Sequence, residues 1–124
     1  DEQAVRAAYR PPHQFNAIDL SSDLKVDFWL LKPVPFEREM FSRRRQVTYH
    51  SEPAWCATAE DTILHKLYWN SISPSDRQMG DVAGIFAVQG EQLDRDYLHH
   101  WAKELGLAAI LEEVLAGKWK PKHT

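Results

Sequence analysis

Residues 15–31, FNAIDLSSDLKVDFWLL, decide the fold because they read as two short strands joined by a polar turn. In the second strand apolar and polar residues alternate with a period of two, which is typical of a strand with unlike faces. A three-residue loop, Ser21–Ser22–Asp23, would place the apolar positions of both strands on one face: Ile18, Leu20, Val26, Phe28 and Leu30. The same register predicts Asp19 and Asp27 together on the opposite face. Asp27 is the unusual member, since aspartate is depleted in strands of this kind.

Composition narrows the class of protein. A chain of 124 residues predicts one domain, and 44% hydrophobic residues argue against disorder. The net charge of −3 argues against a broad surface for nucleic acid or membrane, although Arg43–Arg45 form a local basic run. No apolar run approaches membrane-spanning length, and no signal peptide is present. With Cys56 as its one cysteine, expected to be a small buried thiol, the chain is interpreted as cytoplasmic.

The chain changes its periodicity near residue 58. Before that point we expect a helix over residues 1–9, the hairpin, a short helix over 36–41 and two strands over 46–50 and 54–57, turning at 51–53. Residues 1–57 are therefore predicted to form the sheet-containing part, residues 58–117 a helical cluster packed on it within one compact domain, and residues 118–124 a loose tail. The predicted fold class is α+β, with a short mixed sheet and a C-terminal helical cluster.

Local start and stop signals divide residues 58–117 into four helices. Thr58 with Asp61 forms a capping box, Ser73 precedes Pro74 at a second start, and Asp94 caps a third helix. Glycines follow the last two helices, at positions 106 and 117. The apolar stripes predict a core that contains Leu64, Leu67, Ile85, Phe86, Leu98 and Trp101.

Few residue patterns carry chemistry on their own. The five glycines form no phosphate-binding loop. His99 and His100 are adjacent, so on a helix they point about 100° apart, and a solvated pair is favoured over a metal site. Carboxylates on one sheet face can hold Mg²⁺. On spacing alone, an ordinary pairing of Asp19 with Lys25 is favoured over a metal site at the hairpin.

Five segments together resemble a known family. FNAIDLSSDLKVDFWLLK, PFEREMFSRRR, ATAEDTILHKLYW, SDRQMGDVAGIFAVQG and LDRDYLHHWAKELGL span residues 15–107. They are similar to bacterial nucleotidyltransferase-fold proteins, in particular uncharacterised relatives of the abortive-infection (type IV toxin–antitoxin) nucleotidyltransferases. The resemblance covers nearly the whole chain, to about residue 115, and implies a nucleotidyltransferase-type fold.

The resemblance also implies site residues. The apolar–Asp–apolar strand VDF would make Asp27 the third carboxylate of an Mg²⁺ site, with Asp19 a weaker candidate ligand. Lys66 and Asp81 match positions expected to contact nucleotide, and Arg77 is a third candidate contact. Arg77 precedes Asp81 by four residues on the same predicted helix, so on spacing alone an ordinary surface pair of the two is favoured. The family's Gly-Ser turn and its first two aspartates (Asp-x-Asp) have no match in residues 1–14. The chain thus resembles the part that follows this motif, either as a fragment or as a catalytically incomplete member.

The implied activity is Mg²⁺-dependent transfer of a nucleoside monophosphate from a nucleoside triphosphate to a hydroxyl acceptor, either protein or RNA. We expect the 124-residue chain alone to be inactive. Two alternatives stay open: a non-catalytic member or fragment that binds a protein partner through its helices, and an acidic-site metal nuclease that uses Asp19, Asp23 and Asp27. A protein partner or a second copy of the chain is an expected partner. No membrane partner is expected.

Overall fold

The computed structural model describes residue 3 and residues 14–19, 24–29 and 32–121. The helix predicted over residues 1–9 and the end of the predicted tail lie almost entirely outside these residues. The described elements confirm an α+β protein. They fall into two units, residues 1–42 and residues 43–124. We describe each unit by itself.

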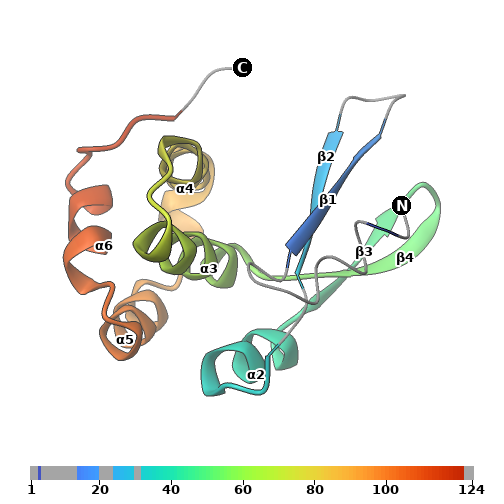
Figure 1. Cartoon of the computed structure of the whole chain (residues 1–124), viewed down its shortest axis with the longest axis horizontal. Coiled ribbons are helices and arrows are strands. Elements are labelled where there is room, and N and C mark those ends of the chain that lie inside the picture. Colours follow the sequence, from blue (N-terminus) through green and yellow to red (C-terminus); the bar gives the residue numbers. More distant parts are fainter. Residues whose placement is uncertain (1–2, 4–13, 20–23, 30–31, 122–124) are drawn as a thin grey trace. The chain divides into compact units, whose positions relative to one another are not determined.

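The first unit contains two antiparallel strands and a short helix (Figure 1). Strands β1 (Gln14–Asp19) and β2 (Leu24–Trp29) pair along their whole lengths, and α2 (Pro35–Ser42) confirms the helix predicted over 36–41. A carboxylate oxygen of Glu37 accepts a hydrogen bond of 3.1 Å from the backbone N–H of Lys32, just before the helix. This contact suits an acidic side chain in a first turn.

The register of β1 and β2 corrects the predicted hairpin. Asp19 pairs with Leu24, and Asp27 pairs with Asn16. Four residues, 20–23, separate the strands instead of three. Because paired residues share a sheet face and neighbours alternate, this change of one residue places Asp19 and Asp27 at positions of opposite faces. The prediction that the two aspartates share a face is therefore wrong.

The second unit begins with a hairpin of β3 (Arg45–Tyr49) and β4 (Glu52–Cys56). Its turn consists of His50 and Ser51, with φ of 51° and 64°. Two consecutive positive φ values indicate a type I′ turn, whose twist matches that of the strands it joins. The turn thus comes one residue earlier than predicted. Among the described residues the four strands form two separate antiparallel sheets, so the predicted mixed sheet is not what they build.

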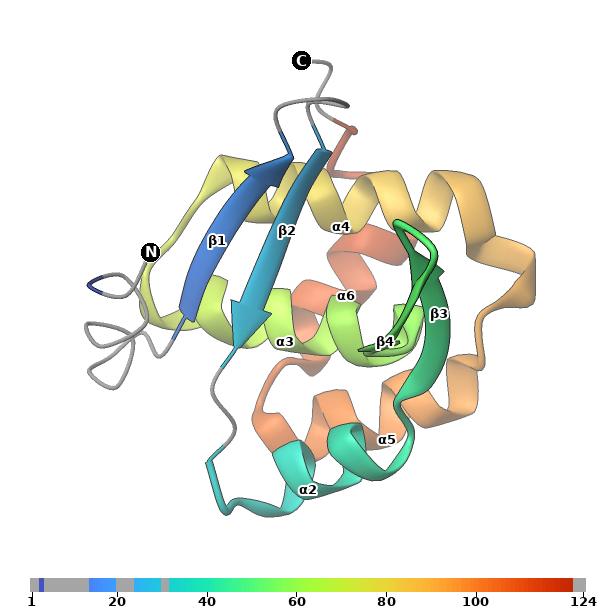
Figure 2. The same ribbon diagram turned by 90° about the vertical axis from the view of Figure 1, so that its right-hand side faces the viewer.

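Helices make up the rest of the second unit (Figure 2). Helix α3 packs against α4 and α5, and α5 packs against α6. Their bounds, with the short 3-10 turn η1, are α3 (Ala59–Ile72), α4 (Asp76–Gln89), η1 (Gly90–Gln92), α5 (Arg95–Leu105) and α6 (Ala108–Leu115). None of the described helices is long and apolar enough to cross a membrane.

Most of the predicted helix ends are confirmed. Thr58 and Asp94 cap α3 and α5, and Gly106 ends α5 with a φ of 73°. The cap of α4 is Ser75 instead of Ser73, because the Ser75 hydroxyl accepts the N–H of Gln78. The Ser75 backbone N–H itself donates to the Asn70 side-chain oxygen at 2.8 Å. Ser75, in the link between the helices, is therefore hydrogen-bonded to both α3 and α4.

The core of the second unit lies between α3 and the helices around it. Its apolar members that are at most 1% exposed are Ile63, Leu64, Leu67, Met79, Val82, Leu98, Ala102 and Leu111. Three predicted core residues, Leu64, Leu67 and Leu98, are among them. The other three, Ile85, Phe86 and Trp101, are only half-buried. The buried apolar residues of α4 are Met79, Val82 and Ala83. Ile85 and Phe86, later in the same helix, are only partly covered.

Core truncations should therefore differ in their cost. Leu67→Ala should lower the free energy of unfolding by about 3 kcal/mol or more, since it empties a fully buried site. Trp101→Ala should cost about half as much, because the surrounding water already reaches part of the indole. Urea unfolding of both variants measures the difference. Equal losses would place Trp101 inside the core and contradict the packing described here.

Candidate functional site

A buried carboxylate lies in the second unit, where the starts of α3 and α5 meet the segment before β3. Asp61, in the first turn of α3, is 0% exposed. One oxygen, Oδ2, accepts from Nε of Arg43 at 3.3 Å, and Oδ1 accepts from the hydroxyl of Tyr97. The Asp61 backbone N–H donates to the Thr58 hydroxyl oxygen at 3.2 Å, which confirms the predicted cap. The Asp61 side chain, however, turns away from the cap toward Arg43 and Tyr97.

Arg43 connects this carboxylate to two further groups. Its guanidinium carbon lies 3.8 Å from the centroid of the Tyr97 ring, and Nη2 lies 3.7 Å from a Glu60 carboxylate oxygen. Burial alone would lower the pKa of the Arg43 guanidinium, but Tyr97, Asp61 and Glu60 outweigh it and raise that pKa. Arg43 is therefore a permanent cation, and the local basic run of residues 43–45 begins with a partly buried, paired arginine.

The other Glu60 oxygen accepts from the backbone N–H of Asp94 at 2.9 Å, and Asp94 caps α5. The cluster thus joins Arg43, two residues before β3, to the start of α3 and the start of α5. Both Asp61 oxygens have partners and no water contact, so this carboxylate acts as an anchor. Sequence reasoning missed it, because the partners lie 18 and 36 positions away.

A second polar cluster contains two residues that the sequence singled out. The Lys66 ammonium donates to the Gln78 side-chain oxygen and to Oδ2 of Asp81, each at 3.1 Å. The Lys66 side chain is 12% exposed and that of Asp81 is 44% exposed. Two of the three predicted nucleotide contacts are therefore brought together across α3 and α4. Asp81 takes Lys66 as its partner, where the ordinary expectation was Arg77.

For the remaining predicted site residues, the structure gives the element on which each lies. Arg77 is exposed in the first turn of α4. Asp27 lies within β2 and Asp19 at the end of β1, in the first unit. In the part of the chain that the structure describes, no group of three or more His, Cys, Asp or Glu side chains could hold a metal ion.

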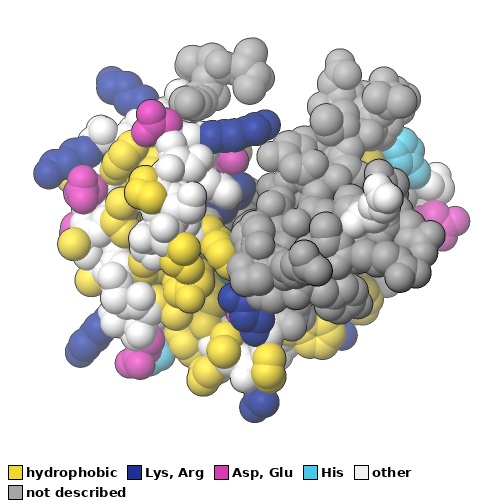
Figure 3. All heavy atoms as spheres, in the orientation of Figure 1, with side chains coloured by type: hydrophobic (Ala, Val, Ile, Leu, Met, Phe, Trp, Pro, Cys, Tyr) yellow, Lys and Arg dark blue, Asp and Glu magenta, His cyan; other side chains and the backbone are white. Residues whose placement is uncertain are grey.

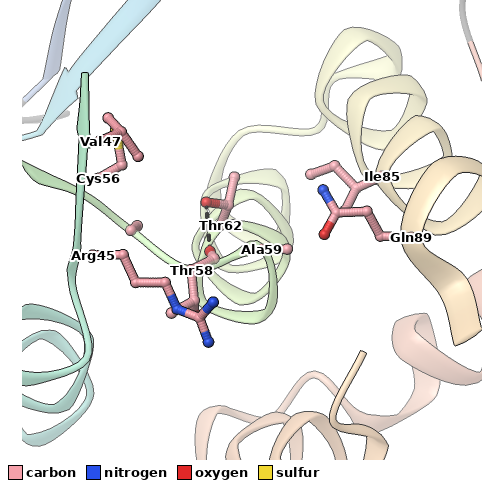
Figure 4. Close-up of a pocket in the computed structure, with 9 residues that line it drawn as sticks. Arg45, Val47, Cys56, Thr58, Ala59, Thr62, Ile85 and Gln89 are labelled. Atoms are coloured by element: carbon pink, nitrogen blue, oxygen red, sulfur yellow. Dashed lines mark hydrogen bonds between the residues drawn. The ribbon is translucent and has the colours of Figure 1, made fainter. Parts of the chain in front are cut away.

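A cleft of about 380 Å³ lies between the hairpin and the helices of the second unit (Figure 4). Arg45, Val47 and Cys56 line it from the strands, and Ile85 and Gln89 line it from α4. At its base, the Thr62 hydroxyl donates to the Thr58 carbonyl at 2.9 Å. Cys56 is exposed here, so the prediction of a small buried thiol is wrong; its strand, β4, is exposed at every position but Ala54.

The histidines of the helices lie in two different settings, one buried and one exposed. The His65 ring is 6% exposed, and its Nε2 accepts from the Trp69 indole N–H at 3.3 Å within α3. His99 and His100 are exposed, and His99 Nδ1 lies 3.5 Å from a Glu112 oxygen on α6. The prediction of a solvated His99–His100 pair is confirmed.

The surface carries apolar side chains among mixed charges. On the face shown in Figure 3, acidic and basic side chains of the described residues are interspersed with apolar ones. The most exposed large apolar residues of the second unit are Val88 (84%), Trp55 (59%) and Ile72 (57%). Trp55 is stacked under the Arg44 guanidinium, whose central carbon lies 4.6 Å from the ring centroid.

No family model, curated protein or solved structure matches the chain.

Removing the Asp61 carboxylate should destabilise the protein strongly. Asp61→Ala leaves the Arg43 charge and the Tyr97 hydroxyl without their shared partner, and we expect a loss of about 3–5 kcal/mol. Tyr97→Phe removes one hydrogen bond and should cost about 1–2 kcal/mol. Asp94→Ala, which removes an exposed helix cap, is the matched control at about 1 kcal/mol. Chemical denaturation gives these values, and an Asp61→Ala loss no larger than that of Asp94→Ala would contradict the anchor.

Proposed function

We propose that this chain forms part of a Mg²⁺-dependent nucleotidyltransferase, with Lys66 as a phosphate contact and Asp27 as one carboxylate of the metal site. The observation that carries the proposal is the position of Lys66. Its ammonium is held between two side chains of the neighbouring helix, so the charge is oriented before any ligand arrives. A preorganised cation suits phosphate binding, since catalysis of phosphoryl transfer is mostly positioning and charge neutralisation.

Asp81 bears on this proposal directly. It is a partly solvated carboxylate 3.1 Å from the Lys66 nitrogen. Because the Asp81 carboxylate of this pair is partly solvated, the attraction is screened by water, and a triphosphate with several negative charges can compete for the same ammonium. In this proposal Asp81 orients Lys66 in the free protein and competes with the incoming phosphate.

Asp27 alone does not complete a metal site. Mg²⁺ needs near-octahedral oxygen ligands, and one carboxylate supplies too few. When bound, Mg²⁺ would neutralise phosphate charge in the reaction. The proposal assigns to this chain one ligand, Asp27, and requires further carboxylates to join it; we derive no step through the metal.

The register of the first hairpin weighs against the acidic-site nuclease. That alternative needs Asp19 and Asp27 close together, and they occupy positions of opposite faces. Asp23 lies outside the described residues. The remaining alternative is a module that binds a protein partner through its helices.

Binding of a fluorescent nucleoside triphosphate to the chain tests the role of Lys66. Lys66→Met should weaken binding at least about tenfold, because one charge-assisted contact is lost. Asp81→Asn should strengthen binding, since it removes the competing carboxylate while keeping the side-chain shape. Lys103→Met, an exposed lysine on α5, is the matched control and should leave binding unchanged. If Lys66→Met and Lys103→Met bind alike, Lys66 is not a phosphate contact.

The role of Asp27 is tested by transfer of labelled nucleotide to protein and RNA acceptors. The 124-residue chain should bind Mg²⁺–nucleoside triphosphate weakly and transfer nothing. In a protein where two further carboxylates accompany Asp27, Asp27→Asn should abolish transfer and change the melting temperature little. Full activity of that variant would remove Asp27 from the metal site, and robust transfer by the 124-residue chain would show that Asp27 needs no further carboxylates.

A further inference from the structure

The β3–β4 hairpin is exposed to an unusual degree. Every residue of β3 is exposed, and in β4 only Ala54 is partly buried. Val47 is 42% exposed, Tyr49 37% and Trp55 59%. A two-stranded sheet is marginal in water, and a sheet gains stability from a third and fourth strand. The described strands supply none, because no other strand among them pairs with β3 or β4.

The two outer edges of this hairpin differ. In a two-residue hairpin loop the flanking residues, here Tyr49 and Glu52, exchange hydrogen bonds, and pairs then alternate along the ladder. Thr48 and Gln46 on β3 therefore direct their backbone N–H and C=O groups outward. On β4 the outward positions are Pro53 and Trp55, and proline has no N–H. The β4 edge is blunted as edge strands often are, whereas the β3 edge keeps its full set of donors and acceptors.

We propose that the outer edge of β3 pairs antiparallel with β3 of a second copy of this chain, around a two-fold axis at Val47. Two copies then share one four-stranded sheet. Gln46 lies opposite Thr48 of the second copy, and these two equivalent pairs exchange four backbone hydrogen bonds. Val47 lies opposite Val47, in a pair without hydrogen bonds, where side chains approach most closely.

The side chains of β3 are complementary in this register. Arg45 lies opposite Tyr49 of the second copy, which allows a cation–π contact, and no like charges oppose each other. The axis at Val47, the midpoint of β3, uses all five residues of both strands. Moving it to Arg45 would place the two arginines opposite each other, and moving it to Gln46 or Thr48 would leave strand ends unpaired. A second copy therefore matches this edge better than an arbitrary peptide does.

Light scattering and sedimentation of the full chain over about 1–200 µM test the proposal. The chain should dimerise, and Val47→Lys should raise the dimer dissociation constant at least about tenfold, because it opposes two like charges at the axis. Val47→Glu should do the same. A one-to-one mixture of the Val47→Lys and Val47→Glu chains should dimerise again, which separates pairing from misfolding.

Two controls locate the contact. Val88→Lys introduces the same charge at an 84% exposed valine on α4 and should leave the dimer unchanged. Thr48→Pro removes an outward N–H without removing a bond between β3 and β4, and should weaken the dimer. In a Cys56→Ser background, Val47→Cys should give a disulfide-linked dimer on mild oxidation, since paired Cα atoms about 4.5 Å apart allow the bond. A monomer at all concentrations, or a dimer unaffected by Val47→Lys and Thr48→Pro, would overturn the proposal.

Discussion

The second unit depends on the buried carboxylate of Asp61. A charge removed from water is tolerated only with partners of opposite charge and with its lone pairs satisfied, and Asp61 meets both requirements through Arg43 and Tyr97. Arg43 lies two residues before the first strand of the hairpin, and Tyr97 lies on α5. The contacts of this one carboxylate thus hold the base of the hairpin against the start of α3. Glu60 adds a hydrogen bond to the backbone N–H of Asp94, the cap of α5.

This anchor explains why the hairpin can be so exposed. Its base is held by Arg43 on one side and by the capped start of α3 on the other, so the strands do not need a helix across their faces to stay in place. The outer edge of β3 remains complete while Pro53 blunts the edge of β4. The same constraint that orders the base of the hairpin leaves its outer part available for pairing with another strand.

Local features of this fold were predictable, whereas pairings between distant residues were not. Thr58, Asp94 and Gly106 act within one helical turn, and each was identified correctly. The first hairpin failed by one residue because nothing local distinguishes a loop of three residues from one of four, yet that residue exchanges the faces of β1. The partners of Asp61 could not be found either, since a capping box predicts that the carboxylate turns back to the backbone N–H of the cap residue, whereas the Asp61 carboxylate turns to Arg43 and Tyr97.

In the candidate site, too, single residues could be predicted but the contact between them could not. The family resemblance identified Lys66 and Asp81 separately, but only the packing of α3 on α4 shows that one charge lies against the other. That contact changes the role expected of both residues. A lysine beside a solvated carboxylate is oriented but partly neutralised, so its affinity for phosphate depends on how readily Asp81 gives way to the ligand. If Lys66 contacts phosphate, Asp81 therefore adjusts the strength of binding without touching the nucleotide, and the pair has to be understood as one unit.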